Sequence, residues 1–144
     1  MTHAVGCYLS DLFAAIGPIA GMMTEESLDS SGPNPCNASH PMPVILFHGT
    51  SDFAVSVEYG EEAVDYWANF NNTSEPIVTT VEDGNGGGDI EHYSYNGGSS
   101  GAAVEYYKII DGYHDTFSYI SYEGQNSLNL IWDFFSRYDI NGRR

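Results

Sequence analysis

The chain has 144 residues, of which 20 are Asp or Glu and only 4 are Lys or Arg, giving a formal net charge of −16 at pH 7. This length suits one domain or part of one. Nucleic acid and anionic membranes are excluded as partners because an acidic chain repels both, and no apolar run approaches the roughly 20 residues of a membrane-spanning helix.

The first forty residues predict a helix, a strand and a loop. Residues 1–9 have helical character, and no Ser, Thr, Asp or Asn cap precedes them, so we expect the chain to begin inside an element. Residues 13–20 predict a strand, in which Gly17 and Pro18 suit the end better than the middle. Residues 22–40 are rich in Ser, Gly, Pro and Asn, and we expect them to form a loop across the top of a sheet.

The chain has two cysteines, Cys7 in the first predicted helix and Cys36 in the following loop. Two are too few for a disulfide scaffold or a zinc site. They either pair, tying the helix to the loop, or remain two buried thiols, and their number does not decide between these alternatives. His3, His40 and His92 are dispersed without ligand spacing, so we expect no metal site.

A short apolar run, Val-Ile-Leu-Phe at residues 44–47, predicts a strand buried on both faces, as in a parallel sheet. Gly49 ends this strand, and a polar loop, Thr-Ser-Asp, follows at residues 50–52. Sites in open α/β sheets form at the carboxyl ends of strands. Asp52 is therefore predicted to be a functional carboxylate, with a turn-capping carboxylate as the alternative.

Beyond this loop, a helix is predicted over residues 56–71, with Ser56 as its cap and Trp67 in an apolar stripe that faces the core. Residues 72–89 are predicted to be a polar linker. The linker ends in Asp-Gly-Asn-Gly-Gly-Gly-Asp, which is similar to a calcium loop. Because it lacks the spacing and closing glutamate of an EF-hand, we expect a flexible turn.

Residues 90–95 and 103–110 predict two strands, and the turn at 96–101 joins them as an antiparallel edge hairpin. A final helix is predicted over residues 126–138, packed on the sheet, with Trp132 half exposed. Its apolar face is expected to contain Leu128, Ile131, Phe134, Phe135 and Tyr138.

His114 lies in the loop Asp-Gly-Tyr-His that follows the second of these strands. An acid after one strand and a histidine after the next are the last two members of the Ser…Asp…His order used by α/β-hydrolases. The chain resembles the C-terminal half of a polyhydroxybutyrate depolymerase or feruloyl esterase, a secreted branch of that superfamily. The resemblance spans nearly the whole chain, through Ser-Asp-Leu-Phe-Ala-Ala-Ile-Gly-Pro-Ile-Ala-Gly at residues 10–21 and the segments 43–52, 91–95 and 104–114.

This resemblance implies one partial α/β-hydrolase domain over residues 1–144, with a mostly parallel sheet, flanking helices and an antiparallel edge hairpin. It further implies an extracellular serine esterase that hydrolyses polymer or plant cell-wall esters, of the polyhydroxyalkanoate or feruloyl type, without a cofactor. Asp52 would be the acid and His114 the base of the triad. The nucleophilic serine would lie just upstream of Met1, so we expect the chain alone to have negligible activity.

Three aromatic residues near the base, Tyr113, Phe117 and Tyr119, are candidates for substrate contact, with packing or surface roles as the alternative. His48 is a rival base, which we interpret as a structural residue that donates to a backbone carbonyl. Ser99 lies in a literal G-x-S-x-G, Gly-Gly-Ser-Ser-Gly. Its flanks predict two strands rather than a strand and a helix, so we expect a turn and not a nucleophile.

A second function class fits the same residues. The chain could be a non-catalytic binding or assembly module that keeps the fold without the serine half. The edge of the predicted strand at residues 13–20 would then pair with another chain and cause self-association. Asp52→Asn should leave such a module's role unchanged, whereas an esterase should lose its turnover.

Overall fold

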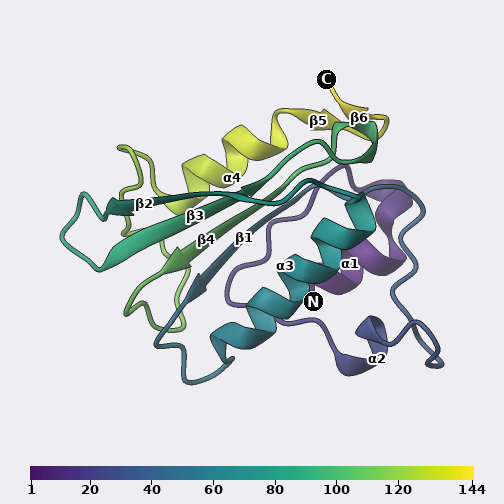
Figure 1. Ribbon diagram of the computed structural model, residues 1–144, viewed down its shortest axis with the longest axis horizontal. Coiled ribbons are helices and arrows are strands. Elements are labelled where there is room, and N and C mark those ends of the chain that lie inside the picture. Colours follow the sequence, from purple (N-terminus) through teal and green to yellow (C-terminus); the bar gives the residue numbers. More distant parts are fainter.

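A four-stranded sheet separates two layers of helix in the computed structural model, which describes all residues 1–144 (Figure 1). The strands, in the order β1-β4-β3-β2 across the sheet, are β1 (Val44–Gly49), β4 (Val104–Ile109), β3 (Asp89–Tyr95) and β2 (Ile77–Glu82). The expected mixed α/β architecture with flanking helices is confirmed. The expected mostly parallel sheet is wrong, because β1 and β4 are parallel while β4–β3 and β3–β2 are antiparallel.

The predicted antiparallel pairing is confirmed in β3–β4, in which Tyr93 lies opposite Tyr106. Its predicted place at the edge of the sheet is wrong, because β2 pairs with the other side of β3 and β1 with the other side of β4. The prediction of a polar linker over residues 72–89 is wrong in part, because this segment contains β2. The sequence of β2, Ile-Val-Thr-Thr-Val-Glu, is rich in the β-branched residues that strands favour. β2 lies at the outer edge of the sheet (Figure 1), and its side chains are almost all exposed.

The segment at residues 13–20 runs along the free side of β1 without becoming a regular strand. Only two parallel bridges form, Ile16 with Val44 and Ile19 with Phe47. Pro18 has no N–H to donate, although its carbonyl accepts from the N–H of Phe47 at 3.2 Å. The predicted strand is therefore reduced to an irregular edge segment.

Four α-helices surround the sheet: α1 (Thr2–Tyr8), α2 (Glu25–Leu28), α3 (Val57–Asn71) and α4 (Ser127–Phe135). Two 3₁₀ turns and a terminal hairpin complete the fold: η1 (Ser10–Leu12), η2 (Ser99–Gly101), β5 (Tyr138–Asp139) and β6 (Gly142–Arg143). The predicted first, middle and last helices are confirmed, except that the last ends at Phe135 and Tyr138 begins β5. The short helix α2 lies unpredicted within the loop at 22–40. None of these helices has the length and apolar character needed to cross a membrane.

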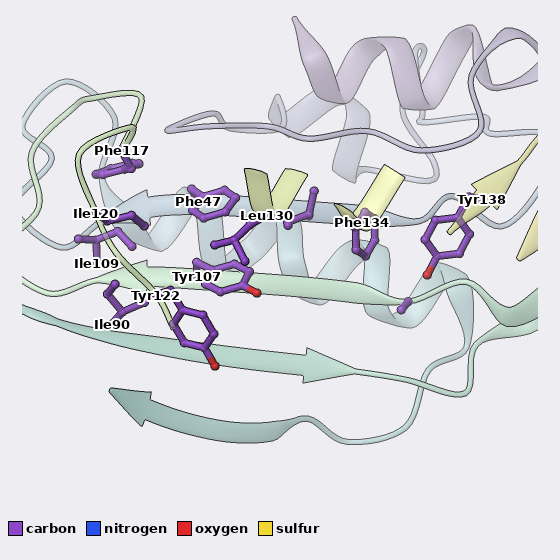
Figure 2. Close-up of a cluster of buried hydrophobic side chains, with 12 residues drawn as sticks. Phe47, Ile90, Tyr107, Ile109, Phe117, Ile120, Tyr122, Leu130, Phe134 and Tyr138 are labelled. Atoms are coloured by element: carbon purple, nitrogen blue, oxygen red, sulfur yellow. The ribbon is translucent and has the colours of Figure 1, made fainter. Parts of the chain in front are cut away.

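The apolar run of β1 is buried on both faces, as its sequence predicts. Val44 and Leu46 pack with α1 and α3, whereas Ile45 and Phe47 pack with α4 and the loop at 117–122 (Figure 2). On the α4 side, the ring of Phe47 stacks on that of Tyr107 with centroids 4.7 Å apart. The two helical layers are thus held by alternate residues of one central strand.

Two helix predictions differ in outcome. Trp67 is fully buried against α1, as expected. On α4, Leu128 was expected on the inward face, and this is wrong because its side chain is exposed. Trp132 is 72 % exposed, more than the half exposure expected. The α4 face that packs on the sheet is centred on Leu130 and Phe134.

Cys7 and Cys36 form a disulfide that ties α1 to the loop after α2. Of the two alternatives left open by the sequence, the bridge is the one found. It spans a sequence separation of 29 residues and constrains the unfolded chain over that length.

Replacing both cysteines with alanine is expected to lower the free energy of unfolding by roughly 3–4 kcal/mol, the chain-entropy value for a closed loop of this size. Urea unfolding followed by circular dichroism measures the loss. Reduction of the unaltered protein with dithiothreitol should shift its midpoint similarly, while the double variant should not respond. Equal midpoints for the variant and the oxidised protein would contradict the prediction.

Candidate active site

Two loops meet where β1 and β4 end together. The parallel register places Gly49 opposite Ile109, so β1 and β4 both end at the same end of the sheet. The backbone N–H of Thr50 donates to the carbonyl of Ile109 at 2.9 Å, and the N–H of Ser51 donates to the carbonyl of Gly112 at 2.9 Å. These bonds hold the loop after β1 against the loop after β4.

The two loops approach so closely that one position accepts only glycine. A β-carbon added at Gly49 would lie 2.2 Å from the carbonyl oxygen of Gly112, far inside van der Waals contact. Nearby, Asp111 adopts a left-handed backbone conformation with φ of 59°, and its N–H donates to the Thr50 hydroxyl at 2.8 Å. The turn that carries the chain toward His114 is therefore fixed by backbone geometry.

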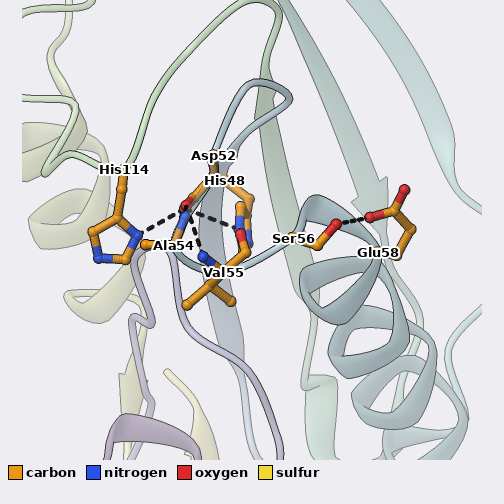
Figure 3. Close-up of polar contacts among 7 residues, drawn as sticks. All are labelled: His48, Asp52, Ala54, Val55, Ser56, Glu58 and His114. Atoms are coloured by element: carbon orange, nitrogen blue, oxygen red, sulfur yellow. Dashed lines mark hydrogen bonds and ion pairs between the residues drawn. The ribbon is translucent and has the colours of Figure 1, made fainter.

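Asp52 lies at the centre of this junction and is only 7 % exposed (Figure 3). Its Oδ1 accepts from the N–H groups of Ala54 at 2.9 Å and Val55 at 2.8 Å, and its Oδ2 accepts from His114 Nδ1 at 2.8 Å. Burial acts to raise the pKa of Asp52, but the bonds from Val55, His114 and Ala54 outweigh it and hold the pKa below its ordinary value of 3.8. Asp52 is thus ionised at neutral pH.

The ring of His114 is half exposed, at 50 % of its side-chain surface. Because Asp52 can only accept, the nitrogen that faces it, Nδ1, carries the proton of the neutral imidazole. Nε2 then has a free lone pair, and Figure 3 shows it on the side of the ring that faces away from Asp52. The arrangement presents a proton acceptor at the surface, oriented by a buried carboxylate.

His48 is fully buried behind the same carboxylate. Its Nε2 lies 2.9 Å from the carbonyl oxygen of Val55, which confirms the expected contact, and 3.3 Å from Asp52 Oδ2. Gly60 of α3 packs against the other side of the ring, where a β-carbon would lie 2.4 Å from Nδ1. Because it is enclosed, His48 supports the loop of Asp52 and presents no nitrogen to a substrate.

The aromatic residues near the base separate into two groups. Tyr113 and Tyr119 are exposed, whereas Phe117 is fully buried in the core and takes the alternative packing role (Figure 2). Phe53, which follows the acid in sequence, was missed. It is 90 % exposed, and its ring centroid lies 6.2 Å from that of Tyr113. The sequence does contain a signal for Phe53, because it is an apolar residue that follows the polar run Thr-Ser-Asp.

Ser99 lies at the opposite end of the sheet from His114. It begins η2, just before β4, while His114 follows the far end of that strand. A six-residue strand is about 20 Å long at ~3.3 Å per residue, so the two side chains cannot meet. The G-x-S-x-G match is a turn, as predicted.

The glycine-rich loop at 83–89 is held by its first residue. Asp83 Oδ1 accepts from the N–H groups of Asn85 at 2.9 Å and Ser121 at 2.7 Å. Asp83 thereby anchors the turn between β2 and β3 to the loop that follows His114. No group of three or more His, Cys, Asp or Glu side chains in the structure is placed to hold a metal ion.

No protein-family model and no curated protein matches this chain. The roles of Asp52 and His114 therefore depend on their geometry and on the motif resemblance described above. A buried carboxylate that orients a half-exposed imidazole is an arrangement suited to general base chemistry at the carboxyl edge of a sheet.

Proposed function

We propose that the chain is the C-terminal part of a serine esterase of the α/β-hydrolase type, in which a serine upstream of Met1 is the nucleophile. The observation that carries the proposal is the 2.8 Å bond between Asp52 Oδ2 and His114 Nδ1, with Nε2 left free. The substrates we propose are carboxylic esters of the polyhydroxyalkanoate or feruloyl type, acted on outside the cell.

The chemistry follows from this pair. The serine hydroxyl attacks the ester carbonyl while His114 Nε2 takes its proton, and the same nitrogen then returns the proton to the leaving alcohol. Water attacks the acyl-enzyme by the same route, releasing the acid and restoring the serine. Asp52 keeps the imidazole in the required tautomer and stabilises the imidazolium. The oxyanion donors would come from the residue after the serine and from an earlier loop.

The charges near the pair support an uncharged substrate. Three of the four cationic side chains are engaged by carboxylates elsewhere: Lys108 with Glu61, Arg137 with Glu105, and Arg144 with Asp139. No Lys or Arg forms an ion pair with Asp52, so an anionic substrate would gain no partner there. The exposed rings of Phe53 and Tyr113 offer an apolar contact beside the base instead.

A non-catalytic assembly module is the second candidate, and exposed apolar side chains favour it. These are Leu12 of η1, Phe13 at the start of the irregular edge segment and Trp132 of α4. Exposed apolar side chains, like an unpaired strand edge, can be buried against another chain. In that case the bond between Asp52 and His114 would serve only to hold two loops together.

The coding sequence immediately upstream of Met1 is the first test. A G-x-S-x-G motif within a few codons supports the esterase, whereas a stop codon or unrelated sequence favours the assembly module. In parallel, residues 1–144 alone should neither hydrolyse p-nitrophenyl butyrate nor react with a fluorophosphonate probe. Hydrolysis by this chain that disappears in His114→Ala would show that the nucleophile lies within it, contrary to the proposal.

A further inference from the structure

A cavity of about 220 Å³ lies between α3 and the sheet, away from the loops of Asp52 and His114. Its lining is formed by Glu61, Val64 and Asp65 of α3, Tyr93 and Tyr95 of β3, and Tyr106 of β4. A second cavity of about 210 Å³ shares Asp65 and Tyr95 and adds Glu75. Three phenol rings and three carboxylates therefore line these two neighbouring cavities.

The hydroxyl of Tyr106 is the unusual feature of this cavity. Tyr106 is 3 % exposed, and its hydroxyl is buried without any hydrogen-bond partner in the chain. A buried polar group without a hydrogen bond is unfavourable, so a partner from outside the chain that bonds to this hydroxyl would gain affinity. By contrast, the neighbouring hydroxyl of Tyr93 donates to Glu91 at 2.8 Å.

The charge around the cavity is negative and partly uncompensated. Glu61 pairs with Lys108 at 2.7 Å, but Asp65 is exposed and forms no ion pair. Burial first, and then the charge of Asp65, raises the pKa of Tyr95, so this ring stays neutral at physiological pH. Neutral phenol rings present electron-rich faces that attract cations.

We propose that this cavity binds a primary or secondary alkylammonium ion. The cation would lie against the faces of Tyr93 and Tyr95, donate one N–H to the carboxylate of Asp65 and donate another to the hydroxyl oxygen of Tyr106. Carboxylates exclude an anion, and a quaternary ammonium has no N–H to satisfy the Tyr106 hydroxyl. The cavity volume of about 220 Å³ is smaller than the roughly 300 Å³ typical of the smallest pockets for drug-sized ligands, so the cavity suits a small ion. Two sources share this chemistry, a free amine and the lysine side chain of a partner protein.

Nuclear magnetic resonance titration of the full chain with n-butylammonium chloride tests the proposal. Saturable shifts of the Tyr93, Tyr95 and Tyr106 resonances are expected. Tyr106→Phe should weaken binding by about 3- to 10-fold, the value of one hydrogen bond, without lowering the urea midpoint. Asp65→Asn should weaken it by about threefold or more, as expected for loss of a partly exposed ion pair.

Glu82→Gln is the matched control, because it removes one exposed carboxylate from the end of β2, outside the cavity. It should leave binding unchanged. The proposal is overturned if no saturable binding occurs, if Glu82→Gln weakens binding as much as Asp65→Asn, or if tetramethylammonium binds as tightly as butylammonium. Tighter binding of butylammonium than of Nα-acetyl-lysine methylamide would assign the site to free amines, and the reverse order would assign it to a lysine side chain.

Discussion

Asp52→Asn is expected to lower kcat/KM for p-nitrophenyl butyrate by about four orders of magnitude in a polypeptide that carries this chain and the proposed serine. The asparagine amide can turn its N–H₂ toward His114 Nδ1, which would move the ring proton to Nε2. Nε2 would then be unable to accept the serine proton. The expected loss thus follows from the tautomer and does not require the loops to move.

Asp115→Asn is the control for this substitution, since it removes the same charge one residue beyond His114 from an exposed carboxylate that bonds only to Thr116. It should retain nearly full activity. Nitrogen-15 chemical shifts of the His114 ring in residues 1–144 report the tautomer directly and should reverse in Asp52→Asn. Activity of Asp52→Asn within tenfold of the unaltered enzyme would refute a catalytic role for this acid.

Gly49→Ala is expected to lower the free energy of unfolding by about 3 kcal/mol, at the upper end of the overpacking range. The added methyl would lie 2.2 Å from a backbone oxygen and 2.4 Å from the adjoining carbon of Gly112, so neither can yield by rotating a side chain. The loops must separate, and the bond between Asp52 and His114 should weaken with them. Urea unfolding measures the first effect, and the His114 ring shifts measure the second.

Gly21→Ala provides the comparison, because a β-carbon there meets nothing closer than 3.7 Å and the residue does not need positive φ. The urea midpoint of Gly21→Ala should match that of the unaltered protein or be slightly higher, because alanine reduces the conformational entropy of the unfolded chain. If both alanine variants unfolded at the same urea concentration, the close approach of the two loops would not exist in solution.

The positions of Asp52 and His114 could be predicted because each depends on a short local pattern. A run of buried apolar residues ended by Gly49 places a polar loop at the end of a strand, and a second strand does the same for His114. Their meeting requires only that the two strands be adjacent and parallel, which they are. The burial of β1 on both faces likewise follows from its composition.

Other features depend on tertiary context that local patterns do not contain. β2 has strand-forming residues but no buried face, so it shows no alternation to separate it from a polar linker. Phe117 and Tyr119 lie two residues apart in one loop, yet the first is in the core and the second is at the surface. The interruption at Pro18 reduces the edge segment to two bridges, and only packing against β1 reveals how much pairing remains.

The insertion of α3, β2 and β3 between the two parallel strands has a consequence for the order of folding. The antiparallel pairs β2–β3 and β3–β4 close over short turns, whereas pairing of β1 with β4 brings together residues such as Val44 and Val104, which are 60 positions apart. Loop-closure entropy favours the short-range pairs, so we expect the sheet to grow from its β2 edge inward. The bond between Asp52 and His114 would then form in the final step, and an incompletely folded chain would contain neither an oriented base nor a substrate surface.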